Sequence, residues 1–313
     1  MSKVVLGVDV GGTSVKLGLF TMEGILKDKW EIPTRREEGG KYILPDVADS
    51  IKAKCEEAGY VKEDIAGVGV GVPGPVMENG VIQFADNLGW GEMNISEILG
   101  GMLDVPVKAG NDANVAALGE MCQGGAQGFS NVVAVTLGTG VGGGVIVGGK
   151  LLAGSMGSAG EIGHLNVEPT EEESCGCGLK GCMEQYASAT GVVRLAKRRL
   201  AKDDTPSVLR DAELSAKSIW DAVKAGDAVA IEIAERFGYY LARGLSYVAA
   251  VVNPEVFVIG GGVSKAGEIL IDYLKPYFDQ YSYPGTRNVQ FRLAKLGNDA
   301  GIYGAAGLII GNK

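Results

Sequence analysis

The sequence lacks the long apolar segment and the positive charge that membrane and nucleic-acid binding proteins carry. One of its longest apolar stretches, residues 245–252, is far shorter than the ~18 residues that a membrane-spanning helix needs. Its 29 Lys and Arg against 38 Asp and Glu give a net charge of −9, which argues against nucleic-acid binding through bulk charge. No basic segment followed by an apolar core opens the chain, so we expect no secretory signal. These absences favour a cytoplasmic protein that binds neither membranes nor nucleic acids.

Proline is also scarce, with 10 residues, whereas glycine is abundant, with 50 among 313 residues. The glycines occur in GG and GxG runs without a three-residue period, which excludes collagen. Apolar residues make up 46% of the chain and charged residues 21%, the balance of an ordinary globular protein. At about 150 residues per domain, this length suggests two domains.

The chain contains the same pattern of strands and glycine turns twice. The pattern predicts strands over residues 4–10, 15–20, 25–32 and 65–72 in the first half, and over 132–137, 141–147, 150–153 and 256–259 in the second. Helices are expected at residues 45–57, 111–122, 184–200, 228–252 and 264–278, the last with Ser264 as N-cap. Strands alternating with helices predict an α/β fold, and the repeated pattern indicates an internal duplication.

Three glycine turns follow predicted strands at positions where a nucleotide can be bound. Gly11–Thr13 and Gly138–Gly140 each offer backbone N–H groups that a phosphate can approach closely, since glycine has no side chain in the way. Asp9, just before the first turn, is placed to hold Mg²⁺. Gly260–Gly262 suits a nucleotide base and ribose lying against the backbone. The first strand is followed by neither the Walker pattern nor G-x-G-x-x-G.

A group of cysteines with the only histidine of the chain forms a candidate metal site. Cys175, Cys177 and Cys182 have the spacing C-x-C-x₄-C, and His164 lies eleven residues before the first of them. Three thiolates and one imidazole suit tetrahedral Zn²⁺, and four protein ligands make that zinc structural rather than hydrolytic. The alternative is a set of buried or redox-active cysteines beside a surface histidine.

Several polar residues flank this candidate metal site or precede a predicted helix. Glu161 and Glu184 lie close to the zinc ligands in sequence, where a rigid metal site would hold their carboxylates for the hydroxyl groups of a sugar. The second nitrogen of His164 could bind the same ligand. Asp112, at the predicted start of a helix, is either an N-cap or a general base for a substrate hydroxyl.

Motifs across almost the whole chain resemble those of the ROK family of sugar kinases, most nearly its bacterial glucokinases. They are D-V-G-G-T-S-V-K at 9–16, G-V-P-G-P-V at 71–76, N-D-A-N at 111–114, L-G-T-G-V-G-G-G at 137–144, E-I-G-H-L at 161–165, C-G-C-G-L-K-G-C-M-E at 175–184 and N-P-E-V-F-V-I-G-G-G at 253–262. The histidine and cysteine motifs are the most specific, and the glycine turns are the least. The ROK repressors carry an additional N-terminal helix-turn-helix, which we do not expect here.

The resemblance implies an actin-like ATPase fold, made of two ribonuclease H-like domains with a cleft between them. We expect a small domain of residues 1–112 and 298–313, and a large domain of residues 113–297 that contains the zinc site at 164–182. The implied reaction is Mg²⁺- and ATP-dependent phosphorylation of the 6-hydroxyl of a hexose, with D-glucose as the expected substrate. The alternatives are mannose, fructose or an N-acylhexosamine such as N-acetylmannosamine, polyphosphate as donor, or a sugar sensor without catalysis. A homodimer or homotetramer is expected.

The resemblance also assigns residue roles, motif by motif. Asp112 would be the catalytic base. The sugar would be bound by Asn87, Asn111, Asp112, Glu161, His164 and Glu184. ATP and Mg²⁺ would be held by Asp9, Gly11, Gly12, Thr13, Gly138, Thr139, Gly140, Gly261 and Gly262. Zinc would be held by His164, Cys175, Cys177 and Cys182.

Overall fold

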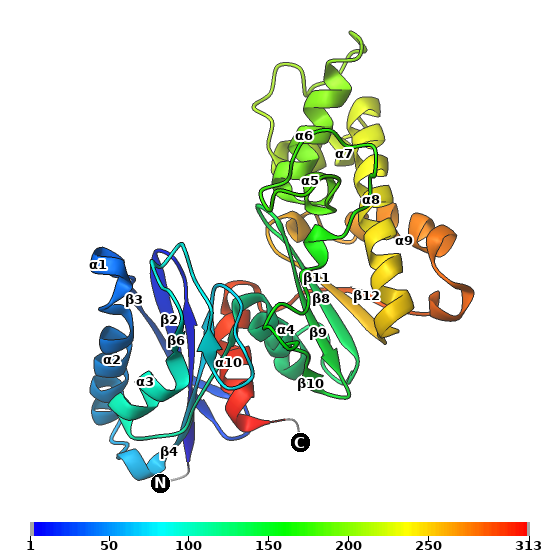
Figure 1. Cartoon of the computed structure of the whole chain (residues 1–313). Helices are drawn as coiled ribbons and strands as arrows, with labels where there is room; N and C mark the ends of the chain where they lie inside the picture. Colours follow the sequence, from blue (N-terminus) through cyan, green and yellow to red (C-terminus); the bar gives the residue numbers. More distant parts are fainter. Residues whose placement is uncertain (1–2, 312–313) are drawn as a thin grey trace. The chain divides into compact units, whose positions relative to one another are not determined.

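The computed structural model describes residues 3–311, which divide into two compact units (Figure 1). The first unit comprises the chain up to Val132, Gly144–Gly160 and the chain from Lys295 onward, and the second comprises Val133–Gly143 and Glu161–Ala294. Within residues 3–311, no helix combines the length and the apolar composition needed to cross a membrane.

The first unit contains a five-stranded sheet with helices on both faces. Its strands are β1 (Val4–Val10), β2 (Ser14–Thr21), β3 (Leu26–Pro33), β4 (Ile65–Val72) and β7 (Val107–Asn111), beside the short pair β5 (Val81–Ile82) and β6 (Met93–Asn94). Its helices are α1 (Glu37–Gly40), α2 (Ile43–Glu57), α3 (Ile95–Leu103), α4 (Asp112–Gln123) and α10 (Ala300–Ile310). The short helical turns η1 (Lys62–Asp64) and η5 (Gly297–Asp299) complete it.

The border between the units passes through the second five-stranded sheet, between residues 132 and 133 and between residues 143 and 144. Its strands are β8 (Val132–Leu137), β9 (Val141–Val147), β10 (Lys150–Leu151), β11 (Val256–Gly260) and β12 (Gln290–Leu293). The helices of the second unit are α5 (Glu184–Ala187), α6 (Ala189–Leu200), α7 (Ala216–Lys224), α8 (Ala228–Val252) and α9 (Ile269–Tyr281), with the short turns η2 (Ile162–His164), η3 (Val263–Ala266) and η4 (Pro284–Thr286).

The two sheets have the same strand order, which confirms the predicted α/β fold and its duplication. The order is β3-β2-β1-β4-β7 in the first sheet and β10-β9-β8-β11-β12 in the second. In the first sheet β2 runs antiparallel to β1, whereas β4 and β7 run parallel to it. Because parallel strands end at the same edge of a sheet, the carboxyl ends of β1, β4 and β7 lie together.

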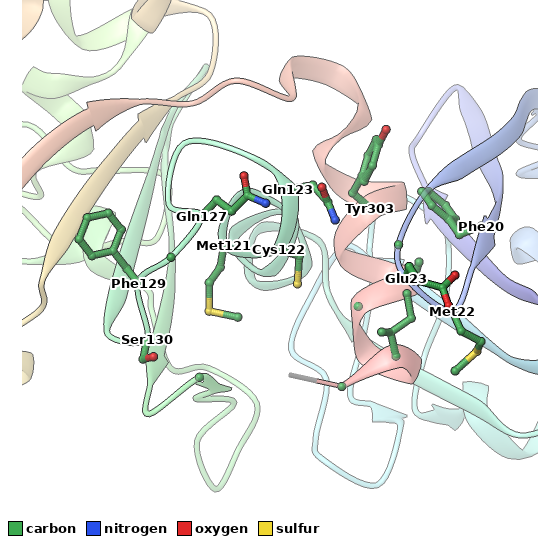
Figure 2. Close-up of a pocket in the computed structure, with 17 residues that line it drawn as sticks. Phe20, Met22, Glu23, Met121, Cys122, Gln123, Gln127, Phe129, Ser130 and Tyr303 are labelled. Atoms are coloured by element: carbon green, nitrogen blue, oxygen red, sulfur yellow. The ribbon is translucent and has the colours of Figure 1, made fainter. Parts of the chain in front are cut away.

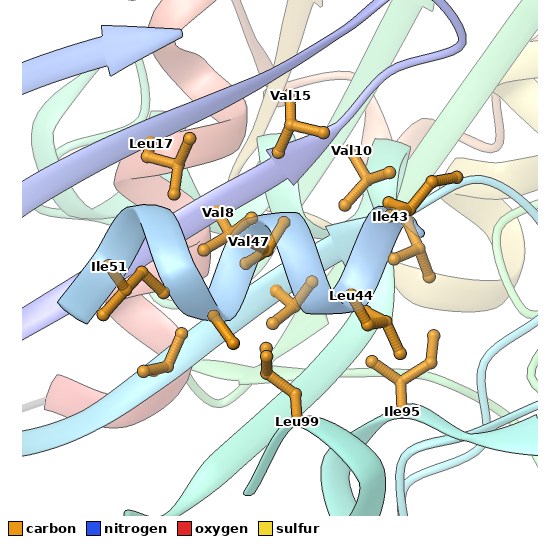
Figure 3. Packing of buried hydrophobic residues seen from close by; sticks show 14 of the residues in the cluster. Val8, Val10, Val15, Leu17, Ile43, Leu44, Val47, Ile51, Ile95 and Leu99 are labelled. Atoms are coloured by element: carbon orange, nitrogen blue, oxygen red, sulfur yellow. The ribbon is translucent and has the colours of Figure 1, made fainter. Parts of the chain in front are cut away.

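The first sheet packs differently on its two faces. One face contributes valines and leucines to a buried core with α2 and α3, including Val8 and Val10 (Figure 3). On the other face, glycines let α10 lie directly on the strands: a Cβ atom at Gly69 would be 1.7 Å from the carbonyl oxygen of Ala305. In the I-A-G-V-G-V-G-V sequence of β4, the valines therefore fill the core on one face of the sheet. The alternating glycines let α10 approach the backbone on the other face.

Helix α4 packs against α10 through small residues, which explains why it belongs to the first unit. A Cβ atom at Gly304 would be 1.6 Å from the carbonyl oxygen of Val115, and one at Gly119 would be 2.3 Å from that of Ala300. The compact units have other bounds than the predicted division at residues 112 and 297, because residues 113–132 with α4, residues 144–160 and residues 295–297 fall in the first unit. The division into functional domains remains a prediction.

Two predicted helices of the second unit have different bounds in the structure. The helix expected over 184–200 is divided at Ser188, whose extended backbone ends α5 and whose side chain caps α6 by accepting a hydrogen bond from the Gly191 N–H. The helix expected over 264–278 begins only at Ile269, after the turn η3. The prediction of Ser264 as its N-cap was therefore wrong, because Ser264 lies inside that turn and donates to the Gly261 carbonyl.

Candidate functional site

In the first unit, the acidic residues predicted from the sequence meet at the carboxyl edge of the parallel strands. Asp9 pairs in register with Gly71, and Val72 pairs with Asn111, so the ends of β1, β4 and β7 are adjacent. Burial, and to a smaller extent the negative charge of Asp112, raise the pKa of Asp9 to about 6, and the positive charge of Lys16 opposes them. Asp9 and Asp112 are thus close enough to interact electrostatically at one edge of the sheet.

The structure decides which residue caps helix α4. Asn111 is the N-cap: its side-chain oxygen accepts a hydrogen bond from the Asn114 N–H at 3.1 Å, while its amide donates to the Gly74 carbonyl at 3.1 Å. Asp112 is the first helical residue, and its carboxylate accepts the Ala113 N–H at 2.8 Å. The N-cap interpretation of Asp112 is therefore wrong, and its general-base role stays a prediction.

The first glycine turn connects β1 and β2 and is supported from β3. The Gly11 N–H donates to the Ser14 carbonyl at 2.9 Å. Thr34, which follows β3, holds the turn twice: its N–H donates to the Thr13 carbonyl at 3.0 Å and its hydroxyl donates to the Gly11 carbonyl at 2.7 Å. At Gly12 an added Cβ atom would meet nothing within 4 Å, so this backbone is open to a ligand.

Asn87, the remaining predicted sugar contact of the first unit, lies in an exposed turn. The turn is closed by the pairing of Ala85 with Trp90. That Asn87 contacts a sugar stays a prediction.

In the second unit, the predicted metal ligands converge on one point. The candidate ligand atoms of His164, Cys175, Cys177 and Cys182 all lie within 4.8 Å of one another. The Sγ atoms of Cys177 and Cys182 are 3.7 Å apart, and the Cys175 Sγ is 3.9 Å from the His164 Nδ1. Zinc–sulfur bonds of about 2.3 Å in a tetrahedron place two sulfurs about 3.8 Å apart, so these residues fit zinc.

The two predicted sugar carboxylates of this unit lie on either side of His164. The Glu161 carboxylate is 4.0 Å from His164 Nε2, and the Glu184 carboxylate is 3.6 Å from His164 Nδ1. Because Nδ1 also faces the cysteines, Nε2 is the nitrogen left for a ligand on the side of Glu161. The side chain of Glu161 is 57% exposed, whereas that of Glu184 is 21% exposed and also reaches the Cys175 thiol at 2.8 Å.

The second glycine turn lies beside this metal cluster. The Glu184 carboxylate accepts a hydrogen bond from the Val141 N–H at 3.3 Å, and a Cβ atom at Gly140 would be 2.4 Å from it. A hollow of about 450 Å³ opens here, lined in part by Thr139, Cys175 and Thr190. The turn and the cluster are therefore neighbours within one unit.

The third glycine turn packs against the strand that leads into the second. Gly261 has a φ of +84°, and a Cβ atom there would be 2.5 Å from the Leu137 carbonyl oxygen, so only glycine fits. At Gly262 an added Cβ atom would meet nothing within 4 Å. The turns at 138–140 and 260–262 therefore lie side by side at one edge of the second sheet, as the predicted nucleotide site requires.

A charged network behind the metal cluster was not predicted from the sequence. Glu171, with a 3% exposed side chain, pairs with Arg194 at 2.7 Å and with Arg198 at 2.9 Å, and accepts a hydrogen bond from the Tyr186 hydroxyl. The Arg198 guanidinium, more than any other group, holds the pKa of Glu171 far below its usual range. The only sequence signal was the acidic segment 170–174 and two arginines four residues apart on a helix.

A further pocket of about 460 Å³ lies in the first unit (Figure 2). It is lined by the turn Met22–Gly24, the end of α4, residues 127–130 and one side of α10, including Tyr303. Its lining includes none of the residues predicted to bind substrate, nucleotide or metal.

The repeated strand order, with a glycine turn after the first strand of each sheet, defines a duplicated actin-like ATPase fold. A family model for the ROK family matches residues 5–312. The chain therefore belongs to the ROK family, as its motifs indicate.

Several relatives that match nearly the whole chain carry kinase names. A glucokinase of Halalkalibacterium halodurans is 41% identical over 310 residues, which are 97% of this chain and 94% of that protein. An N-acetylgalactosamine kinase AgaK of Shewanella sp. is 30% identical over 96% of this chain and 94% of that protein. A solved ROK family glucokinase from Streptomyces griseus, in complex with glucose and AMPPNP, is 35% identical with a TM-score of 0.75, covering 97% of this chain and 98% of that one.

Proposed function

We propose that this protein is a hexose kinase that transfers the γ-phosphate of ATP to the 6-hydroxyl of D-glucose. The observation that carries the proposal is the 41% identity to a glucokinase over 97% of the chain. The similarity to a ROK glucokinase solved with glucose and AMPPNP supports both the sugar and the nucleotide.

In this mechanism Asp112 accepts the proton of the sugar hydroxyl as that oxygen attacks phosphorus. Its position at the first residue of α4 supports the role, because Asn111 already caps the helix. The negative charge of Asp112 is one cause of the raised pKa of its neighbour Asp9. A charged Asp112 is the state that a general base requires.

The remaining residues bind and orient the reactants. The backbone N–H groups of Gly11–Thr13 and Gly138–Gly140 would receive the phosphates, and Gly261–Gly262 would face the adenosine. Glu161 and His164 Nε2 would bind sugar hydroxyls. Phosphoryl transfer needs mainly positioning and charge neutralisation, which is what this set of groups offers.

Two metals have residues suited to them. Asp9 would hold Mg²⁺, which when bound neutralises charge on the ATP phosphates. His164, Cys175, Cys177 and Cys182 would hold zinc, which when bound fixes the loop that carries them.

A kinase for another sugar is the second candidate. The 30% identity to an N-acetylgalactosamine kinase supports it, because that relative also spans nearly the whole chain. Such an enzyme would keep Asp112 and the glycine turns and differ in the sugar that it accepts.

The test is ADP release from Mg·ATP with glucose, mannose, fructose, glucosamine, N-acetylmannosamine and N-acetylgalactosamine, each assayed on protein with verified zinc content. We expect strong preference for glucose. Turnover confined to another sugar would replace glucose as the substrate. No turnover with any sugar, together with tight sugar binding, would instead identify a sensor, and turnover with polyphosphate alone would change the donor.

A further inference from the structure

The glycine turn of the second unit is held by the segment that leaves the metal cluster, residues 184–190. The Ala189 N–H donates to the Gly138 carbonyl at 2.8 Å, and the Thr190 hydroxyl donates to the Thr139 carbonyl at 2.7 Å. The Glu184 carboxylate accepts the Val141 N–H. Each residue from 138 to 141 except Gly140 is thus hydrogen-bonded to segment 184–190, and Gly140 packs directly against Glu184.

The other end of this segment belongs to the metal cluster. Cys182, a candidate ligand, precedes Glu184 by two residues. Glu184 contacts both the metal cluster and the glycine turn: one carboxylate oxygen lies 2.8 Å from the Cys175 Sγ, and the other accepts the Val141 N–H at 3.3 Å. A shift of the cysteine loop would therefore move a group that touches the turn.

The middle of the segment is rigid, so that it can transmit such a shift. Ser188 is fully buried, and its hydroxyl donates to the Glu184 carbonyl at 2.7 Å and accepts the Gly191 N–H at 2.9 Å. The hydroxyls of Ser188 and Thr190 are 3.0 Å apart. The hydrogen bonds of Ser188 fix the short extended step between α5 and α6, and the bond to the Thr139 carbonyl fixes the direction of the Thr190 side chain.

We propose that metal binding by His164, Cys175, Cys177 and Cys182 sets the phosphate affinity of the Gly138–Gly140 turn through segment 184–190, with Thr190 as a positioning residue. The metal then serves the nucleotide as well as the sugar. The inference rests on the proposed function, since it takes the turn to bind the phosphates of ATP.

The first test measures binding of Mg·AMPPNP by calorimetry, without sugar, to zinc-loaded wild type, Thr190→Val and Thr190→Ser. Valine keeps the shape and removes the donor, whereas serine keeps the donor. One neutral hydrogen bond corresponds to a roughly three- to tenfold change in the dissociation constant. We expect Thr190→Val to weaken binding by that factor with unchanged zinc content and glucose affinity, and Thr190→Ser to match wild type.

The second test compares AMPPNP binding by the zinc-loaded and the chelator-treated protein, with circular dichroism to confirm that both are folded. We expect the treated protein to bind AMPPNP at least tenfold more weakly, and added zinc to restore the affinity. In the treated protein, Thr190→Val should weaken AMPPNP binding little further, because the metal cluster no longer holds segment 184–190.

The outcomes separate this inference from the proposed function. Equal AMPPNP affinity with and without zinc, or equal weakening by the valine and serine variants, would overturn the coupling and leave the kinase proposal standing. If the zinc-loaded wild type binds no AMPPNP at all, the ATP-dependent function fails, and the coupling fails with it.

Discussion

The two glycine turns that follow β1 and β8 are supported by the same contacts from different sources. In the first, the N–H and the hydroxyl of Thr34 donate to the turn carbonyls, at 3.0 Å and 2.7 Å. In the second, the N–H of Ala189 and the hydroxyl of Thr190 do so, at 2.8 Å and 2.7 Å. Thr34 directly follows a strand of the same sheet, whereas residues 189 and 190 follow the metal cluster.

The difference shows that equivalent turns in the two copies of a duplicated fold can depend on different parts of the structure for their support. The support of the first turn is as stable as the sheet, whose strands pack on a buried core with α2 and α3 (Figure 3). The support of the second lies in a segment tied to the cysteine loop and to the charged network around Glu171. We therefore expect metal removal to affect the second turn and to leave the first unchanged.

The largest expected effect separates chemistry from binding. Asp112→Asn keeps an acceptor for the Ala113 N–H but removes the general base, so kcat should fall by about 10²- to 10⁴-fold. Zinc content should stay at the wild-type value, because Asp112 belongs to the first unit and the metal ligands belong to the second. Initial rates of ADP release measure the loss, and retained turnover would remove Asp112 from the mechanism.

The next effect removes the metal by mutation. Cys177→Ala deletes the exposed cysteine of the cluster, and we expect bound zinc to fall from about one per chain to near zero. Glucose and AMPPNP should both bind more weakly, because the loop with Glu161, His164 and Glu184 loses its constraint. Metal analysis by mass spectrometry and calorimetric titrations measure this. Cys122→Ser, outside the cluster, is the control, and wild-type affinities in metal-free Cys177→Ala would contradict the argument.

A smaller effect concerns the network behind the cluster and its pH dependence. The pKa of Glu171 is depressed in the folded protein, so its stabilisation is complete above the unfolded value of about 4.5 and is lost as the pH falls below it. Glu171→Gln should lower stability at pH 7 by about 3 kcal/mol and flatten the loss of stability as the pH falls from about 5 to about 3.

Calorimetric unfolding scans at about pH 3, 4, 5 and 7 check this prediction. Glu173→Gln is the matched control, because Glu173 pairs with the same arginines but its side chain is 65% exposed. An exposed pair contributes little, so this variant should differ from wild type by less than about 1 kcal/mol. Equal effects of the two substitutions on stability would show that the burial of Glu171 does not increase the contribution of its ion pairs.

The smallest effect lies in the first turn. Thr34→Val removes one hydrogen bond to the Gly11 carbonyl and should weaken AMPPNP binding roughly three- to tenfold. The factor should be the same with and without zinc. A metal-dependent factor would mean that the first turn, too, depends on the cluster.

Much of the fold follows from local pattern. The strands at 4–10, 65–72 and 141–147 have the bounds that their glycine turns predict, and the metal ligands meet as their spacing predicts. The break at Ser188 was missed because the apolar pattern continues through it, and only a buried hydroxyl with several partners ends α5 there.

Contacts between residues far apart in the sequence were the second kind of feature that could not be predicted. The glycines at 69 and 304 permit α10 to lie on β4 and to cross α4. The residues around each glycine do not indicate which segment, more than 180 residues away, it will contact. The pairing of Glu171 with Arg194 and Arg198 likewise depends on how a loop folds back on α6. The residues that support the two turns, Thr34 and Thr190, share no sequence motif and became visible only in the structure.

The most direct measurement is the AMPPNP dissociation constant of wild type, Thr34→Val and Thr190→Val, each with and without zinc. The account predicts that Thr34→Val weakens binding by one factor in both states, and that Thr190→Val weakens it only in the zinc-loaded state. Equal behaviour of the two variants in both states would contradict the claim that the metal supports the second turn and not the first.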